Sequence, residues 1–219
     1  MAIPAIEPYP MPAPADLPAN TATWPVSAAR AVLLVHDMQN YFLRPFPAAA
    51  QPLDALLHNT ARLRQACTRL GVPVAYTAQP GGMTDRQRGL LKDFWGPGMS
   101  TDEHDRAVTD PLAPAPGDTV LTKWRPSAFH HTGLLDLLRS TGRDQLIVCG
   151  VYAHVGILMT TGEAYAHDIQ TFVVADAVAD FTPADHHMTL RYVAGRCGMT
   201  LPTDTVLHQL HQPHPAERP

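Results

Sequence analysis

The chain has 219 residues, of which 45% are hydrophobic and 16% are charged, and its formal net charge is -4. This length and apolar content predict one globular domain and exclude a disordered protein. We expect no nucleic-acid partner, because neutralising phosphates needs a basic face. We expect no membrane partner, because no apolar run reaches the roughly 20 residues of a membrane-spanning helix.

The ends of the chain differ in composition from the middle. Residues 1–28 are rich in Pro and Ala and predict an extended arm, because proline neither donates to a strand ladder nor continues a helix. Such an arm would wrap over its own domain or over a partner subunit. Residues 211–219 predict a disordered tail, which leaves residues 29–210 as the folded domain. The N-terminus lacks the features of a signal peptide, and three widely spaced cysteines fit the reducing cytoplasm.

Strand and helix patterns alternate along the middle of the chain. Helical spacing of leucines predicts helices at 53–70 and 134–138, and further helices are expected at 155–165 and 183–195. Continuous apolar runs predict five strands buried on both faces, at 31–37, 72–78, 119–122, 145–150 and 171–175. This alternation is typical of an α/β fold. We expect a single-domain three-layer sandwich, with a mostly parallel central sheet and helices on both faces.

Polar residues stand where the predicted strands end. Asp37, Gln79 and Lys123 follow the first three strands, and the fourth leads through Gly150 to a helix start. Because parallel strands bring their carboxyl ends to one edge, Asp37 and Lys123 are expected to approach each other. They would form either a catalytic pair or an ion pair that only caps the sheet. The helix start would direct N–H groups at an anion, with Gly156 either admitting a ligand or merely tolerated there.

Five separated segments carry a resemblance that covers roughly Ile3 to Leu207. In order, they are Leu33 to Phe42, Tyr76 to Pro80, Phe94 to Gly98, Lys123 to Arg125 and Gly150 to His154. They resemble the isochorismatase-like (cysteine hydrolase) superfamily and, within it, the isochorismatase branch. The run from Arg88 to Met99 looks most similar to the phenazine-pathway hydrolases, which act on 2-amino-2-deoxyisochorismate. One departure is Pro126, where close relatives have tyrosine, and it affects the pocket wall or a subunit interface.

The resemblance also separates two chemistries. Amidases of the superfamily use a cysteine nucleophile, and the matching position here is Gly156. Cys149 lies inside a predicted strand, where we expect a small buried hydrophobic residue. The isochorismatase branch lacks the nucleophile as well, so the resemblance implies hydrolysis of a vinyl ether rather than of an amide.

A vinyl ether needs an acid rather than a nucleophile. We expect Asp37 to protonate the terminal methylene carbon of the enolpyruvyl group, with Lys123 orienting Asp37 and holding a substrate carboxylate. Asp37 must then carry a proton in the complex. The charge of Lys123 opposes that state, whereas burial and the substrate's carboxylates favour it.

The other expected site residues would bind a dianionic ring. Arg88 is a candidate for bidentate carboxylate binding, unless it belongs to a solvated basic surface. Gln79 would donate its amide or serve as a turn residue. Backbone N–H groups would come from Tyr152 and Gly156, and the resemblance implies a cis bond between Val151 and Tyr152. Trp95 and Phe42 would wall the ring, or be ordinary core aromatic residues.

No cofactor and no metal are expected, because the histidines lack ligand spacing. His36 is expected to be structural and to face away from Asp37, whereas pairs such as His186 and His187 are expected to be solvated. The leading function is release of pyruvate from 2-amino-2-deoxyisochorismate and from isochorismate. The alternatives are a stand-alone siderophore-type isochorismatase and a non-catalytic interaction protein of the same fold. A homodimer is expected, with the arm and an exposed segment around Pro126 as interface material.

Overall fold

A computed structural model describes residues 3–212 of the chain. Its centre is one six-stranded sheet in the order β3-β2-β1-β4-β5-β6, and every pair of neighbouring strands is parallel. The strands are β1 (Ala31–His36), β2 (Val74–Ala78), β3 (Thr119–Thr122), β4 (Gln145–Val151), β5 (Gln170–Ala179) and β6 (Met199–Leu201). The expected parallel α/β sheet is thus confirmed.

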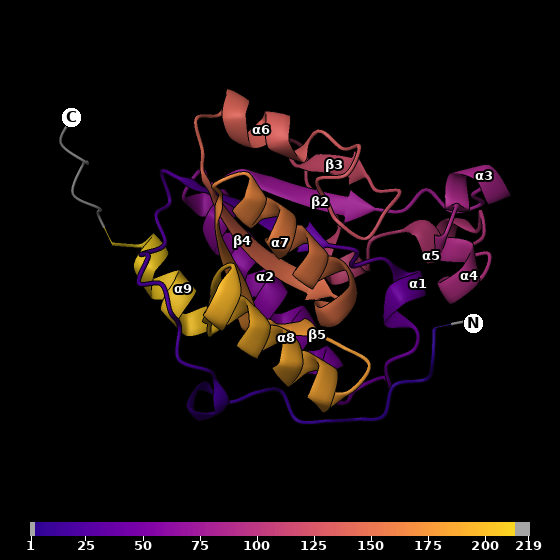
Figure 1. The fold of residues 1–219 in the computed structure, drawn as a ribbon, viewed down its shortest axis with the longest axis horizontal. Helices are drawn as coiled ribbons and strands as arrows, with labels where there is room; N and C mark the ends of the chain where they lie inside the picture. Colours follow the sequence, from indigo (N-terminus) through magenta and orange to yellow (C-terminus); the bar gives the residue numbers. More distant parts are fainter. Residues whose placement is uncertain (1–2, 213–219) are drawn as a thin grey trace.

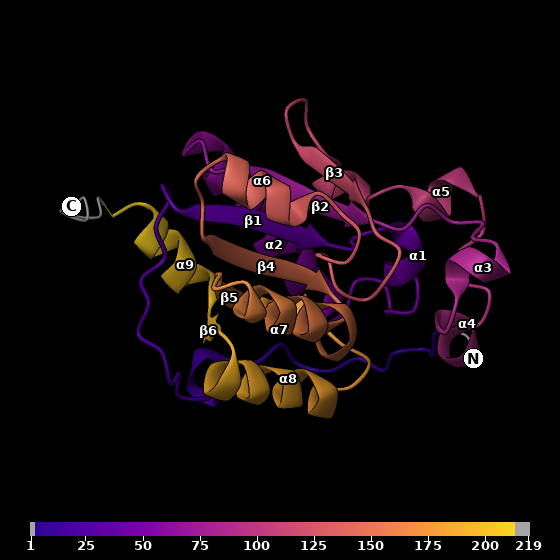
Figure 2. The same cartoon turned by 45° about the horizontal axis from the view of Figure 1, so that its top comes forward.

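Helices cover both faces of this sheet, which makes the three layers visible in Figures 1 and 2. On one face lie α2 (Leu53–Arg69) and α9 (Thr203–Leu210). On the other lie α6 (Leu134–Ser140), α7 (Leu158–Ala166) and α8 (Pro183–Arg196). Alternate residues of each strand enter the two cores: Leu33 packs on the α2 side, and Leu34 packs on the α7 side. Burial on both faces explains why these strands are continuous apolar runs.

Short helices gather at the edge to which the strand arrowheads point in Figure 1. They are α1 (Asn40–Leu43), α3 (Asp85–Arg88), α4 (Leu91–Trp95) and α5 (Glu103–Arg106). A π-helical turn, η3 (Ala153–Ile157), leads from β4 into α7, and two short 3-10 turns are η1 (Pro14–Asp16) and η2 (Asp110–Leu112). The ligand crevice of a parallel sheet is expected at this edge.

Several elements differ from the sequence-based predictions, among them the four short helices at the carboxyl edge of the sheet. Strand β5 continues to Ala179, and β6 and α9 follow the helix that was expected to be the last. Strand β6 has only 3 residues, which is too short for a periodic pattern to be recognised. Within residues 3–212, no helix combines the length and apolar character needed to cross a membrane.

The N-terminal arm lies along its own domain. Ile6, Tyr9 and Val26 are buried in the core on the α2 side, and the Thr21 N–H donates to the carbonyl of Ala194 at 2.9 Å. The arm therefore forms part of the wall of this subunit. Most of the predicted C-terminal tail, residues 213–219, lies outside the described residues.

Candidate active site

Asp37 and Lys123 form a buried ion pair at the carboxyl edge of the sheet. The Lys123 Nζ lies 2.8 Å from Asp37 Oδ2, and the two side chains are 2% and 7% exposed. Thr77, at the neighbouring end of β2, donates its hydroxyl to Asp37 Oδ1 at 2.6 Å and accepts the Asp37 N–H at 3.1 Å. Both carboxylate oxygens therefore have a fixed partner. Such a group cannot rotate freely when a ligand binds.

The backbone turns sharply at Asp37, which has a positive φ of 51°. This bend directs the carboxylate across the end of β1. His36 lies on the α7 side, as expected, but the bend brings its Nδ1 to 3.9 Å from Asp37 Oδ2. Burial lowers the pKa of His36, so its ring is neutral. Its Nδ1 donates to the carbonyl of Val151 at 2.8 Å, which makes His36 a structural residue of the site.

Arg88 is an almost buried cation without an acidic partner. It belongs to α3, and its residue exposure is only 5%. Its Nε donates to the carbonyl of Gly96 at 2.9 Å, and its Nη1 lies 3.5 Å from Gln79 Oε1. Among the described residues no carboxylate pairs with it, and burial lowers its pKa. The solvated-surface alternative for Arg88 is therefore wrong, and its environment suits an anionic ligand.

The turn after β4 carries Tyr152 and Gly156. The Val151–Tyr152 peptide bond is cis, as the resemblance implies. The Gly156 N–H donates to the Tyr152 carbonyl at 3.1 Å, so it is not the unpaired donor that we expected from the sequence. Gly156 lines the pocket, and a Cβ built on it would lie 2.3 Å from His36 Cε1. The Tyr152 hydroxyl donates to the carbonyl of Phe42 and fixes that side of the wall.

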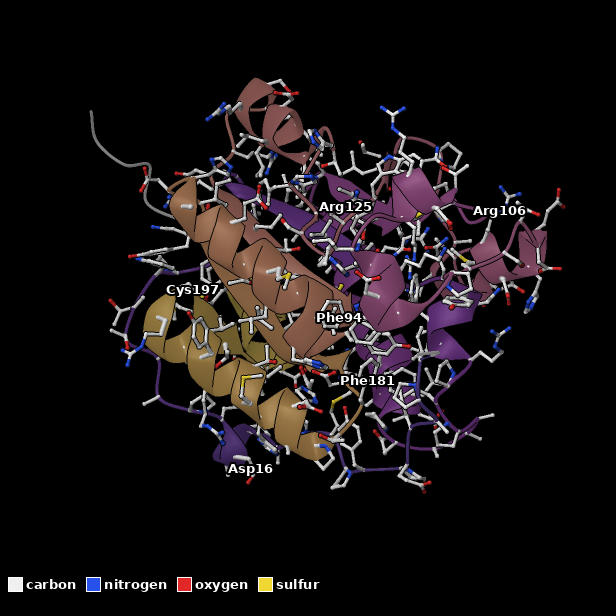
Figure 3. All side chains as sticks on the ribbon, turned by 45° about the vertical axis from the view of Figure 1, so that its right-hand side comes forward. Asp16, Phe94, Arg106, Arg125, Phe181 and Cys197 are labelled. Atoms are coloured by element: carbon white, nitrogen blue, oxygen red, sulfur yellow. The ribbon has the colours of Figure 1, made fainter. Side chains whose placement is uncertain are left out.

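All eight expected site residues line one pocket: Asp37, Phe42, Gln79, Arg88, Trp95, Lys123, Tyr152 and Gly156. Figure 3 turns the edge that bears this pocket towards the viewer, with Arg125 and Phe181 on either side of Phe94. Aromatic rings build one wall, because Phe181 lies 4.5 Å from Tyr152 and 5.8 Å from Trp95, measured between ring centroids. The pocket therefore combines an apolar wall with two cations and one carboxylate.

Sequence reasoning missed several residues of this site. Thr77 stood inside a quoted motif without a role, although its place opposite the end of β1 could have suggested one. Phe181 was missed because β5 was ended too early. Ile3 of the arm also lines the pocket. Pro126 is half-buried and lines the pocket, which supports the pocket-wall interpretation of this position.

Other titratable groups lie outside this pocket. His186 was expected to be solvated, but it is fully buried and bonded to the Tyr9 hydroxyl and the carbonyl of Ala175. Cys149 is buried as expected, and burial raises its pKa to about 12. In the described part of the chain, one exposed cluster of Asp102, His104 and Asp105 has spacing suited to a metal ion. Asp102 already caps α5 there.

Known proteins resemble this chain over most of its length. The family model of the isochorismatase domain matches residues 31–205. The chain belongs to the isochorismatase family. The phenazine biosynthesis protein PhzD1 of Pseudomonas aeruginosa is 58% identical over 205 residues, covering 94% of this chain and 98% of that protein. An isochorismatase of Bacillus subtilis is 52% identical over 210 residues, covering 96% of this chain and 67% of that protein.

A solved structure agrees with this placement in the isochorismatase family. A cysteine hydrolase from Pseudomonas syringae pv. phaseolicola superposes with a TM-score of 0.79 at 25% identity, covering 88% of this chain and 96% of that one. The chain is therefore an isochorismatase-type hydrolase, and the alternative of a non-catalytic interaction protein is set aside. At position 156 this isochorismatase has no side chain that could act as a nucleophile.

Proposed function

We propose that the chain hydrolyses the enolpyruvyl vinyl ether of 2-amino-2-deoxyisochorismate, and also that of isochorismate. The products are pyruvate and a dihydro-hydroxyanthranilate or the corresponding dihydrodiol. The observation that carries this proposal is the buried Asp37 carboxyl in a pocket shared with Lys123 and the unpaired Arg88. The 58% identity to a phenazine biosynthesis protein supports the amino substrate as the main one.

The proposed reaction begins with transfer of a proton from Asp37 to the terminal CH₂ carbon of the enolpyruvyl group. The carbon that bears the ether oxygen becomes an oxocarbenium ion, and water adds to it. The carboxylate of Asp37 takes up the proton that the attacking water releases. The hydroxyl of the resulting hemiketal then loses its proton as the bond to the ring oxygen breaks, and the ring oxygen takes up a proton, which leaves pyruvate and a ring alcohol. No covalent bond to the enzyme is needed.

The protonation of Asp37 depends on what the substrate brings into the pocket. The positive charge of Lys123 lies 2.8 Å from Asp37 Oδ2. A substrate carboxylate beside Lys123 would offset that charge, and the ring would displace water from the aromatic wall. Both changes favour the protonated form, so substrate binding itself would prepare the acid.

Binding of the dianion would depend on Arg88, with Lys123 as the second cation. Arg88 would contribute paired N–H donors to one carboxylate, because its guanidinium has no acid to neutralise it among the described residues. Gln79 would add its amide, and Trp95 and Phe42 would contact the ring. Asp37 is the one acidic residue that lines the described pocket, so no second carboxylate would select an ammonium group on the ring. We therefore propose that both ring substituents are accepted.

The test is a pyruvate-release assay with both substrates, using the wild-type enzyme and Asp37→Asn. We expect pyruvate from both substrates with the wild-type enzyme. Asp37→Asn should lose at least about a thousandfold in kcat while still binding substrate. No pyruvate from either ether, or near-normal turnover by Asp37→Asn, would refute the proposal. Release of pyruvate from isochorismate but not from 2-amino-2-deoxyisochorismate would favour the siderophore-type alternative.

Assembly and location are part of the same proposal. We propose a homodimer that works in the cytoplasm. The three buried cysteines are free thiols, as a reducing compartment would keep them. Large apolar side chains are exposed on the two outer helices α7 and α8, where Met159 is 54% and Tyr192 is 52% exposed. Sedimentation equilibrium that gives the mass of one chain would refute the dimer.

A further inference from the structure

Arg125 belongs to one of the motifs that define the resemblance, but it has no role in the reaction proposed above. It follows β3 by a few residues, and its side chain is half-buried. It does not line the pocket. No carboxylate pairs with it in the part of the chain that the structure describes.

The guanidinium of Arg125 closes the last turn of α3. Its Nη1 donates to the carbonyl of Gln87 at 2.8 Å and to the carbonyl of Trp124 at 2.7 Å. The carbonyl of Gln87 lies in the last turn of this helix, where carbonyls lack intrahelical partners, so a donor at this point fixes the turn. Its Nη2 lies 3.0 Å from the place that a Cβ on Gly89 would take. Arg125 thus packs against the two residues that flank Arg88.

The backbone of Arg125 contacts Lys123, which belongs to the buried ion pair of the site. Its carbonyl oxygen accepts a hydrogen bond from Lys123 Nζ at 3.1 Å. The same Nζ pairs with Asp37. Arg125 therefore connects the Asp37–Lys123 pair to α3, the helix that carries Arg88. This connection spans two segments, 84–89 and 123–126, that no strand pairing links directly.

We propose that Arg125 is a positioning residue for substrate binding, which holds α3 so that Arg88 faces the same substrate as Asp37 and Lys123. The inference rests on the proposed function. A role as a simple attractive charge is disfavoured, because the guanidinium donates to the carbonyls of Gln87 and Trp124 and does not line the pocket. A positioning role needs the forked geometry of the guanidinium, which a lysine ammonium does not reproduce.

The experiment compares Arg125→Lys and Arg125→Gln in the pyruvate-release assay. We expect both variants to raise KM about tenfold, the effect of one hydrogen bond involving a charged group, with kcat within about twofold. The double variant Arg88→Gln/Arg125→Gln should be no worse than Arg88→Gln alone, because Arg125 acts through Arg88. The matched control is Arg86→Gln, which removes an exposed arginine from the same helix and should leave KM unchanged.

Three results would overturn the inference. A normal KM for Arg125→Lys, with a raised KM for Arg125→Gln, would show that charge alone matters. A lower melting temperature with unchanged KM in both variants would show a purely structural role. Additive losses in the double variant would show that Arg125 acts independently of Arg88. If the wild-type enzyme releases no pyruvate, the proposed function fails, whereas normal variants of an active enzyme refute only the role of Arg125.

Discussion

The imidazole of His36 fills the space that any side chain at position 156 would need. A Cβ built on Gly156 would lie 2.3 Å from His36 Cε1 and 3.2 Å from the carbonyl oxygen of Pro126. The ring is fully buried and is held by the carbonyl of Val151, with Thr160 Oγ1 at 3.5 Å from its second nitrogen. Moving the ring would therefore break its hydrogen bond to Val151. A side chain at position 156 would therefore force His36 out of its place.

Replacing Gly156 by alanine or cysteine should therefore destabilise the enzyme. We expect a loss of about 1–3 kcal/mol in the free energy of unfolding, as in other overpacked cores, together with a lower kcat/KM. Urea unfolding measures the first quantity, and pyruvate release measures the second. Gly162→Ala on α7 is the matched control, because a Cβ there meets nothing within 4 Å. A Gly156→Cys variant as stable as the wild type would contradict this explanation.

Some of this site could be predicted from the sequence, because parallel strands bring their carboxyl ends together. Asp37 follows β1 and Lys123 follows β3, and both strands are neighbours of β2. The proximity of the two side chains could therefore be predicted without knowing any other tertiary contact. The end of β5 could not be predicted in this way. Asp176 interrupts its apolar run, and that carboxylate accepts the backbone N–H and the hydroxyl of Thr203 at 2.7 Å each. A polar residue satisfied from across the fold therefore hid the continuation that leads to Phe181.

Thr77 supports Asp37 from the neighbouring strand, and Thr77→Val tests that support. The valine keeps the shape but removes the hydroxyl that bonds both the Asp37 carboxylate and its N–H. We expect kcat to fall about tenfold or more, because the acid loses its fixed orientation, and stability to fall by about 1–3 kcal/mol. Thr77→Ser retains the hydroxyl and should keep most of the wild-type kcat and most of the wild-type stability. Equal effects of valine and serine would show that the methyl group, rather than the hydroxyl, matters.

Tyr9 ties the N-terminal arm to the turn that carries Phe181. Its hydroxyl accepts the Asp180 N–H at 2.8 Å and donates to His186 Nδ1 at 3.2 Å. Tyr9→Phe leaves both partners buried and unpaired, so we expect a loss of about 1–3 kcal/mol in urea unfolding. KM should also rise, because Phe181 belongs to the pocket wall. The control is Tyr192→Phe at an exposed site on α8. Identical unfolding curves for the two variants would contradict this role of the arm.

The buried His186 should make the enzyme sensitive to acid. Burial lowers its pKa to about 4, whereas an unfolded histidine titrates near 6.5. Its contribution to stability is therefore complete above pH 6.5 and is lost as the pH falls towards 4, because the unfolded state then binds the proton more readily. The full shift corresponds to about 3 kcal/mol.

His186→Gln removes this titration, so we expect a shallower loss of stability between pH 6.5 and pH 4 than in the wild type. Urea unfolding at several pH values measures the slope. His154 works in the opposite direction, because its hydrogen bond to Asp180 raises its pKa and its contribution is lost as the pH rises. Both proteins retain His154, so the difference between their slopes isolates His186. Parallel slopes for the wild type and His186→Gln would show that His186 does not titrate with unfolding.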